Sequence, residues 1–264
     1  MKIQELGALE GDLLLFGGPY SNLQASEALA KIADSFAPGH VICTGDVVAY
    51  CADPAPCVDL IRARGWPVVA GNCERQLAAR ADRCGCGFDD GSACDLLSRG
   101  WYPHADALIG DEARSWMADL RDVITLTHQG QRLAIIHGGL SDISRFLWPD
   151  SPEDEFSAEI ALIRDQIGGV DKVIAGHCGV AFHRRIGNVD WINAGAIGLP
   201  PHDGRSETRY AVLNDLGVTF HRLTYDAAAA QSAMIAAGLT QGYEAALLSG
   251  IWPSEDVLPA SLRR

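Results

Sequence analysis

Short apolar runs recur along the chain, and each one ends in small or polar residues. Five of these runs have the length and composition of buried strands: LLLF at 13–16, VICTGD at 41–46, VVAGN at 68–72, LAIIHGG at 133–139 and KVIAGH at 172–177. Spans with helical character, at 24–36 and 54–65, separate the first three runs. This alternation predicts an α/β fold whose strands are mostly central and buried on both faces.

The pattern changes in two later regions. Residues 73–130 are poorer in strand signal and contain the glycine-rich CGCGFDDGSAC followed by the helix-like DEARSWMADLRDV. After residue 190, TRYAVLND and VTFHRL predict a hairpin around 215–217, and the alanine-rich tail from 226 predicts helix. The chain contains neither an internal repeat nor a low-complexity linker, so we expect one domain over 1–264 with a helical excursion at 73–130.

Composition and charge narrow the classes of function. The 264 residues are 48% hydrophobic, which is ample for a core, and 21 basic against 34 acidic residues give a net charge of −13. The overall field repels nucleic-acid backbones and anionic lipids, which argues against non-specific nucleic-acid binding. A small phosphorylated ligand remains compatible, because a bound cation dominates its local field. With no long apolar stretch and no signal-peptide pattern at the N-terminus, we expect a cytoplasmic protein without a membrane association.

The eight cysteines are expected to be free thiols, since a core of this size needs no disulfides and the cytosol keeps thiols reduced. Cys84, Cys86 and Cys94, with His104 beyond them, form a loose set that could hold zinc, although the spacing matches no standard zinc pattern. A thiol-based redox or metal protein is therefore a third interpretation. The absence of any C-x-x-C pair argues against it.

Four polar residues directly close four of the apolar runs: Asp46, Asn72, His137 and His177. Ligands of open α/β sheets bind at the carboxyl ends of strands, where these residues are expected to lie. Each of them alone has an ordinary explanation as a turn residue or a satisfied polar side chain. Together, a carboxylate, an amide oxygen and two imidazoles suit a divalent ion such as Mn, Fe or Zn.

These motifs also resemble a known family. GDVVAYCADP, VVAGNCERQL, IIHGG, AGHCGVAFHRRIG, WINAGAIGLP and YAVLND are similar, in order and spacing, to the calcineurin-like metallophosphoesterase superfamily, particularly its small bacterial members. The C-terminal AGLTQGYEAALLSG is similar to the tail of that branch. The resemblance implies two packed mixed β-sheets flanked by helices in an αββα sandwich. It also implies two metal ions about 3.5 Å apart that clamp a phosphate while a bridging hydroxide attacks phosphorus.

The resemblance assigns the metal ligands position by position. Asp46 matches the carboxylate that bridges both ions, and Asn72, His137 and His177 match the remaining ligands of the second ion. The second half of the site is therefore complete.

The first half departs from the family pattern. Its ligands are the Asp and His of a D-x-H motif and the second His of G-H-x-H, and this chain has Gly18, Tyr20 and Gly179 there. Three of its four ligands are missing, so we expect one firmly bound ion and a doubtful second one. Tyr20 and Asn22 stay candidates for contact with substrate.

Other residues near the motifs are further candidates. Cys73 follows Asn72 at a position where many relatives carry a histidine, so Cys73 joins Asp46 as a catalytic candidate. His183 and His202 could replace lost ligands, although spacing cannot decide this. Arg205 lies beyond the GAIGLPP loop, where an arginine could pair with a phosphate, as could Arg184, Arg185 and Arg209. Tyr50 is expected to pack, because its spacing from Asp46 does not suit a metal-binding tyrosinate.

Two functions follow from this pattern. The first is a metal-dependent phosphoesterase that hydrolyses a phosphomonoester or phosphodiester with one firm metal ion and reduced activity. The second is a non-catalytic protein that keeps the fold and the half-site to bind a phosphorylated ligand or a protein partner, because a fold alone does not establish activity.

Overall fold

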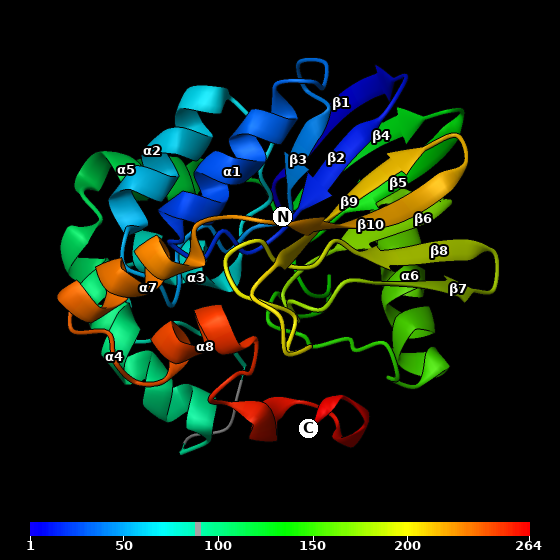
Figure 1. Cartoon of the computed structure of the whole chain (residues 1–264). Coiled ribbons are helices and arrows are strands. Elements are labelled where there is room, and N and C mark those ends of the chain that lie inside the picture. Colours follow the sequence, from blue (N-terminus) through cyan, green and yellow to red (C-terminus); the bar gives the residue numbers. More distant parts are fainter. Residues whose placement is uncertain (88–90) are drawn as a thin grey trace.

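The computed structural model describes residues 1–87 and 91–264, and the side chains of 93–95 lie outside the description. The chain forms two β-sheets that pack against each other (Figure 1). The larger sheet has six strands in the order β1 (Ile3–Leu9), β4 (Val123–His128), β5 (Gln131–Ile135), β6 (Lys172–Ala175), β8 (Val189–Asn193) and β7 (Phe182–Ile186). The smaller has four, in the order β10 (Gly217–Leu223), β9 (Thr208–Asn214), β2 (Leu13–Phe16) and β3 (Val41–Cys43). Both sheets are mixed, with parallel and antiparallel neighbours.

The sheets meet through apolar side chains, as strand β2 illustrates. Leu13 and Leu15 belong to the core between the two sheets, whereas Leu14 and Phe16 belong to the core under the helices. All four side chains are fully buried. A strand covered on both faces has no polar side, which explains its continuous apolar run.

Helices cover the outer face of each sheet (Figure 1). Among the described residues, α6 (Glu153–Ile167) is the helix that shares a buried core with the outer face of the six-stranded sheet, where Phe156 packs against Trp191 of β8. The four-stranded sheet shares its core with α1 (Leu23–Ala33), α2 (Pro54–Arg64), α3 (Asn72–Ala78), α4 (Ala93–Leu108), α5 (Asp111–Asp119), α7 (Ala227–Ala236) and α8 (Tyr243–Ser249). Short 3₁₀ turns, η1 (Glu255–Val257) and η2 (Ala260–Leu262), end the chain. This arrangement confirms the predicted α/β fold with two mixed sheets flanked by helices.

Most predicted elements are present, and some are not. The run at 13–16 is β2, and the hairpin around 215–217 joins β9 to β10. The run at 68–72 was expected to be a strand, and it makes only two isolated bridges before α3 begins. Strand β4 lies inside the segment read as poor in strand signal, and β1 was not predicted because its residues are mostly exposed.

The helical regions lie where the pattern placed them. The segment 73–130 contains most of α3 together with α4 and α5, and the tail from 226 contains α7 and α8. Among the described residues, no helix combines the length and the apolar character that crossing a membrane requires.

Candidate metal centre

The loops that follow β2 and β3 run side by side and carry the first site residues. The backbone N–H of Gly18 donates to the carbonyl of Gly45, and that of Tyr20 donates to the carbonyl of Asp46. Tyr20 and Asp46 adopt left-handed backbone conformations with φ of 52° and 55°, and so does His177 with φ of 62°. Such conformations are costly for these residue types, and they cluster at functional sites.

A buried glutamate holds the Asp46 loop in this conformation. Glu74 Oε2 accepts hydrogen bonds from the backbone N–H groups of Asp46 and Gly71, both at 2.8 Å, and Oε1 accepts one from Val48 at 3.3 Å. Gly71 must be glycine, since a Cβ there would lie 2.2 Å from Asp46 Oδ1. The sequence G-N-C-E thus ties the start of α3 to the loop that presents Asp46.

The four predicted ligands converge on one point. Asp46 Oδ2 lies 3.3 Å from His137 Nε2 and 4.0 Å from His177 Nδ1. His137 Nε2 lies 3.2 Å from Asn72 Oδ1 and 3.1 Å from His177 Nδ1. A tetrahedral ion with ligand bonds of about 2.1 Å needs donor atoms about 3.4 Å apart. These four distances lie near that separation, so the donor atoms are grouped compactly enough to hold one ion.

Neighbouring groups orient two of these ligands. His137 Nδ1 lies 2.6 Å from the carbonyl oxygen of Thr44. Because a carbonyl only accepts, Nδ1 carries a proton and Nε2 of the neutral ring keeps its lone pair for a metal. Asn72 Nδ2 donates to the carbonyl of Cys84 at 2.9 Å, which turns Oδ1 toward His137. Supporting bonds of this kind are what a metal site needs to keep its geometry.

The charges of the cluster also suit a cation. Burial would raise the pKa of Asp46, but neighbouring His137 outweighs burial and brings that pKa below its usual range. Burial opposes charge on His137, and Asp46 nevertheless raises the pKa of His137. Burial and His137 together lower the pKa of His177 to about 4, so its ring is neutral near pH 7. A carboxylate, an amide oxygen and imidazole nitrogens fit Mn, Fe or Zn.

The other half of the site is built differently. A Cβ on Gly18 would lie 2.4 Å from Cζ of Tyr20, so the tyrosine ring takes the space that an aspartate side chain would need. A Cβ on Gly179 would lie 3.5 Å from Tyr20 Oη and 3.6 Å from Cη2 of Trp252. At the positions where the resemblance places first-ion ligands, the chain therefore presents aromatic rings.

A pocket lies directly over both halves. Its polar lining includes Asp46, Asn72 and His177. Its aromatic lining consists of Tyr20, Tyr50, Trp101, Phe146, Trp148, Tyr243 and Trp252. Among the described residues around this pocket, none is lysine or arginine.

Cys73 lies inside this pocket. The backbone N–H of Cys73 donates to Asp46 Oδ1 at 3.3 Å, and the side chain is almost fully buried. Burial, reinforced by Asp46, raises the pKa of the Cys73 thiol well above its usual range, so the thiol is protonated at neutral pH.

The structure places the other candidates away from the pocket lining. Asn22 caps α1, because its Oδ1 accepts from the backbone of Ala25 at 3.0 Å. His183 lies on β7 and contacts Asp190 at 3.0 Å. His202 accepts a hydrogen bond from the backbone of Trp252 at 2.8 Å, and Arg205 is exposed.

The structure describes only part of the zinc set that the sequence left open. Cys84 and Cys86 lie together on the pocket lining, but His104 Nε2 lies 3.0 Å from the carbonyl of Ala52 instead. The side chain of Cys94 lies outside the described residues. Asp46, His137 and His177 are the single cluster of three potential ligands found among the described side chains. The seven described cysteines are free, as predicted.

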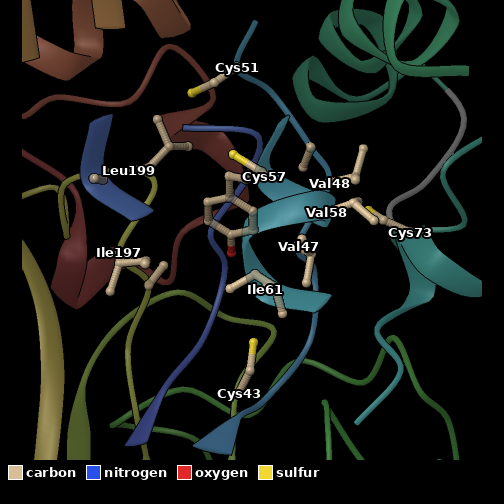
Figure 2. Close-up of a cluster of buried hydrophobic side chains, with 14 of the residues drawn as sticks. Cys43, Val47, Val48, Cys51, Cys57, Val58, Ile61, Cys73, Ile197 and Leu199 are labelled. Carbon is tan, nitrogen blue, oxygen red and sulfur yellow. The ribbon is translucent and has the colours of Figure 1, made fainter. Parts of the chain in front are cut away.

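Most of these thiols belong to the core. Figure 2 shows Cys43, Cys51, Cys57 and Cys73 among valine and isoleucine side chains. In that view Val47 and Val48 of the loop that follows β3 lie between Cys73 and Leu199. The same loop therefore presents Asp46 to the site and anchors itself in the core.

Several functional residues escaped the sequence reasoning. Glu74 stands three residues after Gly71, and this spacing of a capping box could have indicated it. Phe146 and Trp148 come from the irregular segment between β5 and α6, and Trp252 comes from the tail. We find no local pattern that would have placed those three rings over the metal ligands.

Comparisons with known proteins agree with this geometry. A sequence model described as the calcineurin-like phosphoesterase superfamily domain matches residues 20–215. An uncharacterized protein of Methanocaldococcus jannaschii is 23% identical over 226 residues, which cover 78% of this chain and 85% of that protein.

Solved structures share the fold. A metallophosphoesterase from Sphaerobacter thermophilus has a TM-score of 0.72 at 20% identity, covering 92% of this chain and 100% of that one. A hypothetical protein from Pyrococcus horikoshii has a TM-score of 0.74 at 16% identity, covering 92% and 99%. These likenesses support the fold alone, whereas the family match spans most of the chain. This protein therefore belongs to the calcineurin-like phosphoesterase superfamily.

Proposed function

We propose that this protein is a metal-dependent phosphoesterase that hydrolyses a phosphomonoester or a phosphodiester with one divalent ion. The observation that carries the proposal is the convergence of four donor atoms, from Asp46, Asn72, His137 and His177, at separations of 3.1 to 4.0 Å. The ion, Mn, Fe or Zn, supplies a Lewis acid for phosphate and lowers the pKa of a water molecule to near neutrality.

The residues of the chain prepare the site for this chemistry. Glu74 accepts two backbone hydrogen bonds from the Asp46 loop and a third from Gly71, which fixes the carboxylate of Asp46 without rearrangement during reaction. The Thr44 carbonyl fixes the tautomer of His137. Phe146 covers His177 with a ring-centroid separation of 4.1 Å and limits the access of bulk water.

Cys73 is proposed to face the substrate. Its thiol lines the pocket next to Asp46 and stays protonated at neutral pH, so it serves as a neutral hydrogen-bond donor to a phosphoryl oxygen. It is not a nucleophile in this proposal, since nucleophilic attack needs the thiolate.

One ion is proposed instead of two, because Tyr20 fills the space beside Gly18 and Trp252 packs near Gly179. A single ion provides half of the charge clamp of a two-ion site, so turnover should be slow. The presence of these rings where the first ion's ligands are missing also favours the second candidate function, a protein that binds a phosphorylated ligand or a protein partner without turnover.

Metal analysis combined with hydrolysis tests the proposal. Protein purified without chelators should contain one divalent ion per chain and hydrolyse an aryl phosphodiester slowly. Asp46→Asn and His137→Ala should lower metal affinity by more than about 100-fold and abolish hydrolysis, because each removes a direct ligand. Tight binding of metal with no turnover of any phosphate ester would favour the binding function.

His183→Ala is the matched control. His183 is another histidine, but it contacts Asp190 on β7 and does not line the pocket. The variant should keep both metal and activity. Hydrolysis that survives Asp46→Asn, or that disappears in His183→Ala, contradicts the assigned site.

A further inference from the structure

The pocket over the metal ligands has two chemically distinct walls. One wall carries Asp46, Asn72 and His177. The other consists of aromatic rings, and three of the six tryptophans of the chain take part in it: Trp101, Trp148 and Trp252. Seven aromatic rings beside the candidate metal ligands offer a large apolar surface to a ligand.

The aromatic wall is preorganised by contacts between its own rings. The ring of Tyr50 has centroid separations of 4.9 Å to Tyr20, 5.2 Å to Trp101 and 4.5 Å to Tyr243. Edge and tilted contacts of this kind hold aromatic rings in fixed orientations. A ligand that packs on this wall would therefore lose little of its binding energy to ordering the side chains.

Two further rings line the pocket beside His177. Phe146 and Trp148 stack with centroids 5.2 Å apart and an interplanar angle of 7°, and Phe146 covers His177. Both rings are half-buried, as is Trp252. The metal ligand His177 is thus continuous with a surface on which a flat group can stack.

Charge restricts the phosphate. The described lining contains one carboxylate and no lysine or arginine, so a single divalent ion leaves at most one net positive charge in the pocket. A phosphodiester carries one negative charge, whereas a phosphomonoester carries close to two at neutral pH. Burying a second phosphate charge without a partner is costly.

The polar groups of the aromatic side chains are few and uncharged. Trp101 is 3% exposed, and its indole Nε1 has no hydrogen-bond partner among the described atoms. A neutral donor suits an oxygen of a diester or of its organic group better than it suits an additional charge.

We propose that the aromatic wall binds the ester group of the substrate, and that the substrate is an aryl or nucleoside phosphodiester monoanion. The rings of Tyr20 and Trp252, which lie where the first ion's ligands are missing, thus form part of a subsite for a flat apolar group. This inference rests on the proposed function for the reaction, but the subsite itself is a binding property that can be measured without turnover.

Binding of phosphinates tests the subsite, because these monoanions resemble diesters and have no ester bond to cleave. We would titrate the manganese-loaded protein by calorimetry with methylphenylphosphinate, methylcyclohexylphosphinate and dimethylphosphinate. The phenyl compound should bind about tenfold more tightly than dimethylphosphinate, in line with the usual strength of stacking on aromatic side chains. The cyclohexyl compound should fall between them, and the dianion phenylphosphonate should bind no more tightly than methylphenylphosphinate.

Variants locate the effect. Trp148→Leu and Trp252→Leu should each reduce the preference for the phenyl ring several-fold and leave the affinity for dimethylphosphinate unchanged. Trp116→Leu removes a tryptophan of α5 that does not line the pocket and should change neither. Adenosine 5′-(methyl phosphate) and methyl phenyl phosphate, compared for binding and turnover, then distinguish a nucleoside ester from a simple aryl ester.

The outcomes separate the two proposals. Equal affinity for the three phosphinates in the wild-type protein overturns the subsite, whether or not the tryptophan variants fold, and leaves the hydrolase proposal intact. A ring preference that both leucine variants retain also overturns it. A ring preference that these variants reduce, in a protein that hydrolyses no ester, supports the subsite and removes the proposed function.

Discussion

The two halves of the site contrast in how they are built. The metal half consists of side chains that each follow a strand or begin a helix, and its donor atoms lie 3.1 to 4.0 Å apart. The aromatic half draws its rings from the loops after β2 and β3, from α4 and α8, and from irregular segments near residues 146 and 252. Loops held by the scaffold can change their side chains without changing the fold. This chain therefore keeps the family fold while aromatic rings lie where the resemblance places the first ion's ligands.

The largest effect on the difference between the two halves is expected from restoring the missing metal ligands. The triple variant Gly18→Asp, Tyr20→His and Gly179→His should bind two manganese ions per chain, whereas we propose that the wild-type protein binds one. The new side chains recreate a carboxylate and two imidazoles around Asp46 and remove the ring that fills the space beside Gly18. Metal content after gel filtration, measured by elemental analysis, checks this.

The substitutions in the triple variant are also expected to lower the stability of the fold, and this loss must be measured. Gly18 and Gly179 have φ of +46° and +72°, so each new side chain adds about 1–2 kcal/mol of backbone strain. Thermal unfolding of the metal-free protein measures that loss. Gly179→His alone should stay at one ion, because the Tyr20 ring remains in place. A triple variant that folds and still holds one ion contradicts our placement of the lost half-site.

Removing the ring itself tests whether the halves are independent. Tyr20 is 5% exposed and packs on Gly18 and Tyr50, so Tyr20→Ala should lower the free energy of unfolding by about 3–5 kcal/mol. The metal content should stay at one ion per chain. Urea denaturation and elemental analysis measure the two quantities. Tyr20→Phe keeps the ring and is the control, with an expected loss below about 1.5 kcal/mol.

The difference between the two halves also explains which parts of the site could be predicted from the sequence. The convergence of the side chains of the metal half was predictable because Asp46, His137 and His177 each close an apolar run, and a buried strand delivers the next polar residue to a common edge. The α/β class was predictable from the apolar runs, whereas the two mixed sheets were predictable only from the family resemblance. Strand β1 was not predicted because its residues are exposed or only partly buried. The run at 68–72 was predicted to be a strand, but it forms only single isolated bridges.

The aromatic half was not predictable from local pattern. Trp252 lies more than 70 residues beyond Gly179 in sequence, and a β-branched or aromatic residue in an irregular segment carries no periodic signal. Sequence reasoning noticed that ligands were absent at Gly18 and Gly179. It could not show which side chains take up the space, because tertiary packing alone decides that.

Glu74 offers a way to sharpen the comparison through pH. Burial, reinforced by Asp46, raises the pKa of Glu74 to about 7 from an ordinary value of 4.5. Because the folded-state pKa is raised, the contribution of protonated Glu74 to stability is complete below pH 4.5 and is lost as the pH rises through 7. The metal-free protein should therefore lose about 1–3 kcal/mol of stability over that range.

Denaturant unfolding at several pH values, with chelator, measures this slope. Glu74→Gln should flatten it, since glutamine does not titrate. The variant should also be less stable at every pH, because its amide group would face backbone N–H groups of Asp46, Val48 or Gly71 that now donate to carboxylate oxygens. An unchanged slope in Glu74→Gln would assign the pH dependence to other groups, such as His137.

The smallest effect is expected at Cys73, which lies next to Asp46 on the pocket lining. If the protonated thiol donates one hydrogen bond to the substrate, Cys73→Ala should lower kcat/KM by about fivefold, which corresponds to the usual net worth of one such bond. Cys73→Ser keeps a donor and should stay close to the wild-type value. Both variants should keep one metal ion, since Cys73 is not a ligand. A loss of about 100-fold or more in the alanine variant would instead indicate proton transfer by the thiol, and full activity in it would leave Cys73 a packing residue like the other thiols of the core.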